Sequence, residues 1–175
     1  ALIVGRRAAD VAGARWWNHM PAALVRAQLV DCWDDYLRVS CIRNPFDKVV
    51  SAFWMQQPAQ TRAALIDGPF AQARMAFSDW LLGGGDLMTD REVLTIDGVF
   101  CLTDTIRYEC LREDLERLCA KIGLPWRPEM LAAYKSTHRG RREAFADYYD
   151  DATAARVGEA CAFEIAQFGY PASPG

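Results

Sequence analysis

The residues best suited to chemistry in this chain are Arg43 and Ser51, which flank the start of an expected helix. The stretch Tyr36–Ile42 is short, apolar and β-branched enough for a buried strand. Asn44 is a favourable N-cap and Pro45 fits the first helical position, so a helix is expected directly after the strand. At such a junction the helix dipole and backbone N–H groups favour an anion, to which Arg43 and Ser51, eight residues apart, could both reach. The pattern fits a phosphate site, and it fits at least as well a salt-bridged structural arginine beside a solvent-facing serine.

The surrounding elements alternate between helical and strand-like patterns, which is typical of an α/β protein with a mainly parallel sheet flanked by helices. Apolar spacing, with Gly and Pro at the ends, predicts helices over Pro21–Leu29, Pro45–Met55, Phe70–Leu82, Leu111–Ile122, Arg127–Tyr134 and Asp151–Phe168. The stretch Val93–Tyr108 carries short strand-like runs with a turn at Asp97-Gly98. We expect Tyr36–Ile42 to be a central parallel strand, with Ile106 in a neighbouring strand. No repeat and no linker rich in Pro, Gly or Ser divides the chain, so residues 1–175 are expected to form a single domain.

The overall charge and composition limit the classes of partner. A net charge of −3 gives no global attraction to nucleic acid or to an anionic membrane, so an anionic ligand requires a local basic site. No apolar run approaches the roughly 18 residues that span a bilayer. The six cysteines lack C-x-x-C spacing and mostly lie in apolar stretches, which predicts reduced, buried thiols and a cytoplasmic protein.

The segment at residues 43–53, RNPFDKVVSAF, closely resembles the 3'-phosphate-binding motif of sulfotransferases that use 3'-phosphoadenosine 5'-phosphosulfate (PAPS). The resemblance is nearest to the bacterial and Golgi carbohydrate branch, in which an arginine and a serine eight positions apart bind the 3'-phosphate. Arg43 and Ser51 keep that spacing. Further stretches that are similar to the family pattern are IRYECL (106–111), IGL (122–124), KSTHR (135–139), YYD (148–150) and FGY (168–170).

This resemblance covers roughly residues 19–170 and implies a P-loop-nucleotide-transferase-like sulfotransferase fold. It implies PAPS as the co-substrate and adds Ser136, Thr137 and Arg139 to Arg43 and Ser51 as cofactor-binding residues. No metal ion is expected, because sulfuryl transfer carries less charge than phosphoryl transfer.

The chain departs from the family at the loop that holds the 5'-phosphosulfate. That loop follows a P-K-x-[GA]-[GS]-[TS] pattern, and nothing in these 175 residues matches it. The single glycine cluster, Gly83-Gly84-Gly85, has no lysine and ends an expected helix, so we interpret it as a flexible loop. Three explanations remain open: the chain is a fragment, the loop lies in a part outside the structure, or catalysis has been lost.

His19, just before an expected helix, is the candidate catalytic base. A histidine in this region acts as the base in some carbohydrate sulfotransferases that the chain resembles. A base is needed because an alcohol attacks poorly until its proton is drawn off, and a histidine suits this near neutral pH. The alternative is a histidine that caps the helix or packs on Trp16 and Trp17. His138 lies in a basic loop and is expected to help cover the cofactor.

The leading hypothesis is an enzyme that transfers a sulfuryl group from PAPS to an acceptor hydroxyl on a small molecule or a carbohydrate. The alternative is a non-catalytic nucleotide-binding or interaction module derived from the same fold. A kinase is a third possibility, but no lysine-bearing glycine loop or metal-binding carboxylate motif supports it. Tryptophans at 16, 17 and 33 could line an acceptor site, whereas Trp54 fits the core. The basic residues at 135, 139, 141 and 142 could attract an anion or form an ordinary solvated loop.

Overall fold

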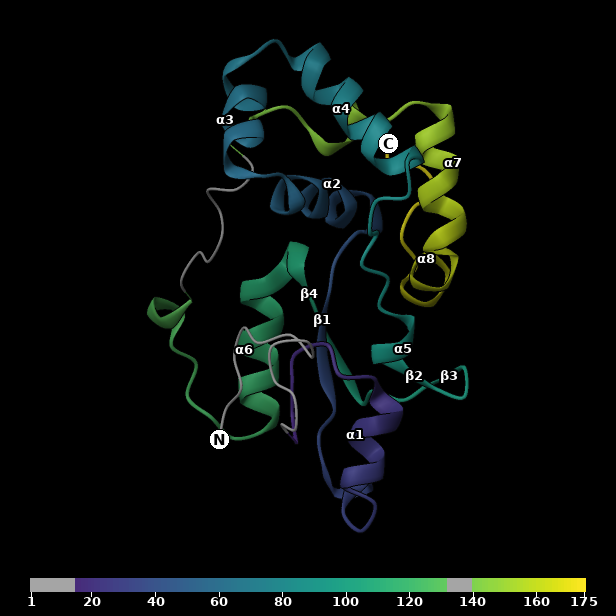
Figure 1. The fold of residues 1–175 in the computed structure, drawn as a ribbon. Coiled ribbons are helices and arrows are strands. Elements are labelled where there is room, and N and C mark those ends of the chain that lie inside the picture. Colours follow the sequence, from purple (N-terminus) through teal and green to yellow (C-terminus); the bar gives the residue numbers. More distant parts are fainter. Residues whose placement is uncertain (1–14, 132–139) are drawn as a thin grey trace. The chain divides into compact units, whose positions relative to one another are not determined.

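The computed structural model describes residues 15–131 and 140–175, and the chain divides into two compact units. Unit 1 comprises Ala1–Ile42 and Asp90–Ile106, and unit 2 comprises Arg43–Thr89 and Arg107–Gly175. The fold is α/β, with a small two-stranded parallel sheet and flanking helices (Figure 1). The expectation of a single domain over 1–175 stays a prediction.

Unit 1 contains short elements. They are α1 (Ala22–Gln28), the 3-10 helix η2 (Trp33–Asp35), β1 (Val39–Ile42), α5 (Arg91–Leu94), β2 (Thr95–Ile96), β3 (Val99–Phe100) and β4 (Asp104–Arg107), which runs one residue beyond the unit. The predicted turn at Asp97-Gly98 is confirmed: it joins antiparallel β2 and β3, and φ is 52° at Asp97 and 78° at Gly98. Positive φ at both central residues matches the twist of a tight hairpin, and glycine adopts it without a steric penalty.

Strand β1 pairs with β4, so the expected neighbour strand that contains Ile106 is confirmed. The strand begins at Val39 and not at Tyr36. Next to the start of β1, the backbone N–H of Arg38 donates to the Thr103 hydroxyl at 2.8 Å, and the Arg38 carbonyl accepts from the Thr103 and Asp104 N–H groups at 2.9 and 3.2 Å. The described residues place no further strand beside β1, so the expected central position in a larger parallel sheet is not observed among them.

Unit 2 is mainly helical. Its elements are α2 (Pro45–Gln56), α3 (Ala59–Asp67), α4 (Phe70–Leu82), η3 (Tyr108–Cys110), α6 (Leu111–Lys121), η4 (Pro128–Met130), η5 (Phe145–Tyr148), α7 (Asp151–Ala160) and α8 (Ala162–Phe168). The predictions for α2, α4 and α6 are confirmed to within a residue, whereas the long C-terminal helix is broken at Cys161. Of the helix expected over Arg127–Tyr134, only η4 is helical before residues 132–139, which lie outside the described part. In the described ranges, no helix has the length and apolar character needed to cross a membrane.

The core of unit 2 forms around α2, which lies against α4 and α7 (Figure 1). The apolar face of α2 is fully buried and consists of Phe46, Val49, Val50, Phe53 and Trp54. Burial of each large side chain stabilises the fold by about 1.5–3 kcal/mol. Two tyrosines of the 148–150 stretch close this core: Trp54 Nε1 donates to the Tyr148 hydroxyl at 3.2 Å, and the Tyr149 hydroxyl donates to the Phe46 carbonyl at 2.8 Å.

The expectation of buried thiols is wrong for most of the cysteines. All six are free, but only Cys161 is buried, and Cys41 and Cys110 are exposed. Burial raises the pKa of the half-buried Cys101 thiol, against the opposing effect of Arg38, and keeps that thiol protonated.

Arg141 is a structural residue, which corrects the expectation that it attracts an anion or belongs to a solvated loop. Its side chain is 11% exposed. Nη1 donates to the carbonyls of Leu65, Ile66 and Gly68 at 2.8–3.0 Å, and Nη2 donates to Glu143 at 2.7 Å. Arg141 therefore ties the chain after residue 139 to the end of α3.

The ion pair between Arg141 and Glu143 predicts that the stability of the fold depends on pH. The Arg141 hydrogen bond holds the pKa of Glu143 below its ordinary value of 4.5. Such a carboxyl group stabilises the fold above its ordinary pKa and loses this contribution as the pH falls through the lower, folded-state pKa. We expect Glu143→Gln to lower the melting temperature at pH 7, with the difference from the wild type shrinking below about pH 4. Thermal melts between pH 7 and below pH 4 measure this difference in melting temperature. Glu159→Gln, at an exposed position on α7, is the control. A difference that does not change with pH would contradict the prediction.

Candidate functional site

The junction before α2 is fixed by two hydrogen bonds. The Asn44 side chain accepts from the Phe46 N–H at 2.9 Å, which confirms the predicted N-cap. The Asn44 N–H donates to the Glu109 carboxylate. Pro45 has no N–H group. The N–H groups of Asn44 and Phe46 are already occupied by these two hydrogen bonds, so an anion cannot use them. The expectation that unpaired N–H groups wait for a phosphate is therefore wrong at these two positions.

Arg43 lies beside Asp47 and Tyr108. Its Nε and Nη2 atoms both lie 2.6 Å from Asp47 Oδ2, and the side chains are only 22% and 16% exposed. The guanidinium carbon stacks 4.2 Å from the centre of the Tyr108 ring. This confirms the salt-bridged arginine of the alternative interpretation. It also leaves the opposite edge of the guanidinium, with Nη1, without a hydrogen-bond partner among the described residues.

Ser51 lies half-buried near the end of the second turn of α2. Asp47 precedes it by four residues, so the two share one face of the helix. Arg43 thus pairs with a residue that lies one turn before Ser51 on the same face. The described geometry is thus compatible with a ligand that contacts both Arg43 and Ser51.

Glu109 connects this junction to the C-terminal end of the chain. Its second carboxylate oxygen accepts from the Tyr170 hydroxyl at 3.1 Å. Arg107 stacks 5.2 Å from the Tyr170 ring and donates to the Phe168 carbonyl at 2.7 Å. Residues more than 60 positions apart in the sequence therefore stabilise the turn that carries Arg43.

His19 is exposed and lies in a turn of unit 1 with φ at 57°. It does not cap α1, whose N-cap residue is Pro21, so the capping part of the structural alternative is wrong. Of the other expected site residues, Ser136, Thr137, His138 and Arg139 lie outside the described residues. Trp54 is buried as predicted.

Sequence reasoning missed the partners of Arg43. The spacing of four between Arg43 and Asp47 is a local signal for an ion pair across the helix start. No local signal identifies Glu109 as the acceptor for the Asn44 N–H, because the two residues are 65 positions apart.

Comparisons of the chain with protein-family models, curated proteins and solved structures found no match. In the described ranges, no group of three or more His, Cys, Asp and Glu side chains is arranged to hold a metal ion.

The cap at Asn44 gives a stability prediction. We expect Asn44→Ala to lower the free energy of unfolding by about 1 kcal/mol, because the Phe46 N–H loses its acceptor at the helix start. Asn44→Ser keeps a capping oxygen and should retain most of the stability. Urea unfolding followed by circular dichroism compares the three proteins. Equal losses in both variants would show that the cap itself contributes nothing.

Proposed function

We propose that this chain is part of a sulfotransferase that transfers a sulfuryl group from PAPS to an acceptor hydroxyl. The proposal includes the finer assignment of its α/β fold as a sulfotransferase fold. A cytoplasmic location is proposed with it, in keeping with the six free thiols.

One observation carries the proposal: segments that resemble the family in sequence contact one another in unit 2. Glu109 of the 106–111 segment accepts from Asn44 beside Arg43 and from Tyr170 of the 168–170 segment. Tyr149 of the 148–150 segment donates to Phe46 of the arginine–serine motif. Chance similarities at four separate places in a sequence would have no reason to meet. Their contacts support the interpretation that the segments form one functional unit.

Arg43 and Ser51 are proposed to hold the 3'-phosphate of the cofactor. Asp47 fixes the Nε edge of Arg43, and the Nη1 edge can donate to a phosphate with a charge-assisted hydrogen bond. Asp47 also offsets the positive charge of Arg43, so the site needs further donors. Ser136, Thr137 and Arg139 are the proposed additional donors.

The proposed reaction is an in-line displacement at sulfur. The acceptor oxygen forms the new O–S bond while the bond from sulfur to the bridging oxygen of the phosphosulfate breaks. Adenosine 3',5'-bisphosphate leaves with the electron pair, and His19 takes the proton of the acceptor hydroxyl. Positioned donors stabilise the charge that develops on the leaving group.

The second candidate function is a non-catalytic nucleotide-binding module. The occupied N–H groups at Asn44 and Phe46 favour it, because they reduce the number of donors at the junction. Both functions predict that the spent cofactor binds at Arg43, and only the first predicts turnover.

Binding of adenosine 3',5'-bisphosphate tests the site that the two functions share. We expect Arg43→Ala to weaken binding by about 2–4 kcal/mol, the scale for loss of a charge-assisted contact in a partly buried site. Arg156→Ala removes the same charge from an exposed position on α7 and should leave the affinity unchanged. Isothermal titration calorimetry measures all three proteins. Equal affinities of the wild type and Arg43→Ala, or no binding by the wild type, would refute the assignment of Arg43.

Turnover separates the two functions through His19. We expect His19→Gln to keep the affinity for adenosine 3',5'-bisphosphate and to lower kcat by about 100-fold or more, the usual weight of a positioned base. Because His19 is exposed, the melting temperature of the His19→Gln variant should stay close to that of the wild type. Transfer of radiolabelled sulfate from PAPS to a panel of alcohols and sugars provides the assay. An unchanged kcat would remove His19 from the mechanism, and bisphosphate binding without transfer to any acceptor would favour the non-catalytic module.

A further inference from the structure

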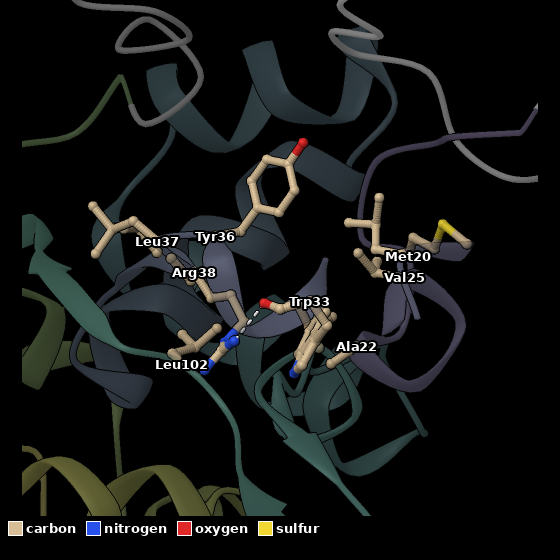
Figure 2. A pocket seen from close by; sticks show the side chains of 12 residues that line it. Met20, Ala22, Val25, Trp33, Tyr36, Leu37, Arg38 and Leu102 are labelled. Atoms are coloured by element: carbon tan, nitrogen blue, oxygen red, sulfur yellow. Dashed lines mark hydrogen bonds between the residues drawn. The ribbon is translucent and has the colours of Figure 1, made fainter. Parts of the chain in front are cut away.

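Unit 1 contains a pocket of about 320 Å³ with mainly apolar walls. Figure 2 shows Met20 and Val25 on one side of it and Leu37 and Leu102 on the other, with Trp33 and Arg38 between them. All of these residues belong to unit 1, and none of them is proposed to bind the cofactor. Pockets of this size in proteins hold small organic molecules.

Arg38 is the charged residue of the pocket wall, and it is firmly held. Its Nε donates to the Cys101 carbonyl at 2.9 Å and its Nη1 to the Trp33 carbonyl at 2.6 Å. The guanidinium also lies 4.8 Å from the centre of the Trp33 ring (Figure 2). These contacts fix its orientation without neutralising its charge, because carbonyl oxygens and an indole carry no net charge.

In the described part of the chain, the only carboxylate that contacts Arg38 is that of Asp34, and it offsets the positive charge of Arg38 only weakly. Asp34 lies 3.3 Å from Nη1, but its side chain is 93% exposed, whereas that of Arg38 is 18% exposed. Solvent and salt screen an ion pair of this kind. The Nη2 group of Arg38 has no hydrogen-bond partner among the described residues. A mostly buried cation therefore retains both charge and a donor.

We propose that this pocket binds a compact aromatic molecule that carries one monoanionic group, such as an aromatic carboxylate. The apolar walls and the Trp33 ring accept the aromatic part, and Arg38 pairs with the anionic group. A single remaining donor group matches a monoanion better than a phosphate, which needs several donors. This site goes beyond the proposed cofactor site and does not depend on it.

The charge of the ligand tests the role of Arg38 without disturbing the fold. Replacing Arg38 would also remove the hydrogen bonds that join η2 to the segment after β3, so the change is made in the ligand instead. The probes are 2-naphthoate and its neutral analogue 2-naphthylmethanol. We expect calorimetry to give an affinity for naphthoate about tenfold or more above that for the alcohol, the scale of one charge-assisted hydrogen bond. Equal affinities would overturn the pairing with Arg38.

A matched pair of variants tests the place of binding. Leu37 lines the pocket and is 37% exposed, whereas Leu24 on α1 does not line it and is 46% exposed. Both leucines can therefore accept a charge without loss of core packing. We expect Leu37→Glu to weaken naphthoate binding at least tenfold, because the substitution removes an apolar contact and places a negative charge near the carboxylate of the ligand. We expect Leu24→Glu to leave naphthoate binding unchanged. Equal effects of the two substitutions, or no naphthoate binding at millimolar concentration, would overturn the site.

Discussion

The hydrogen bond from the Asn44 N–H to Glu109, together with the Asn44 cap, fixes the first turn of α2 within unit 2. This turn matters because the buried face of α2 carries the centre of the unit 2 core. A change in the first turn would displace Phe46, whose carbonyl also accepts from the buried Tyr149 hydroxyl. The position of Arg43 and the packing of the core therefore depend on the same few contacts at the start of one helix.

Three partly buried arginines differ in how far neighbouring carboxylates offset their positive charge, and therefore in how strongly they can attract an anion. Arg141 donates to three carbonyls and to Glu143, so its charge and its donors are largely used within the protein. Arg43 is fixed by a carboxylate that offsets its charge but occupies one edge only. Arg38 is fixed mainly by carbonyls and keeps most of its charge. Because burying a charge without a partner is unfavourable, attraction for an anion should increase from Arg141 through Arg43 to Arg38.

Local chemistry in the sequence predicts the elements well and their long-range contacts poorly. Asn44 with Pro45 identifies the start of α2, and Asp97 with Gly98 identifies a hairpin turn, because each signal depends only on adjacent residues. Helix α3 was missed because it buries no residue and so has no apolar period. At the site, the Arg43–Asp47 pair follows from spacing along a helix. The carbonyls that accept from Arg141 and the Glu109 carboxylate that accepts from the Asn44 N–H lie 65 or more positions away, where only the fold brings them together.

The Arg43–Asp47 pair restricts how a phosphate could be recognised at α2. A dianion near Arg43 also meets the Asp47 carboxylate, and at a partly buried site this repulsion is only partly screened. Binding then requires either a further cation or a rotation of Asp47 away from the ligand. Arg141 cannot supply the cation without losing its bonds to the end of α3. Arg139 is the cation among the proposed additional donors, and it would supply this charge in the proposed site. If the chain binds the proposed cofactor, its affinity for the 3'-phosphate should therefore depend on residues 135–139 as well as on Arg43.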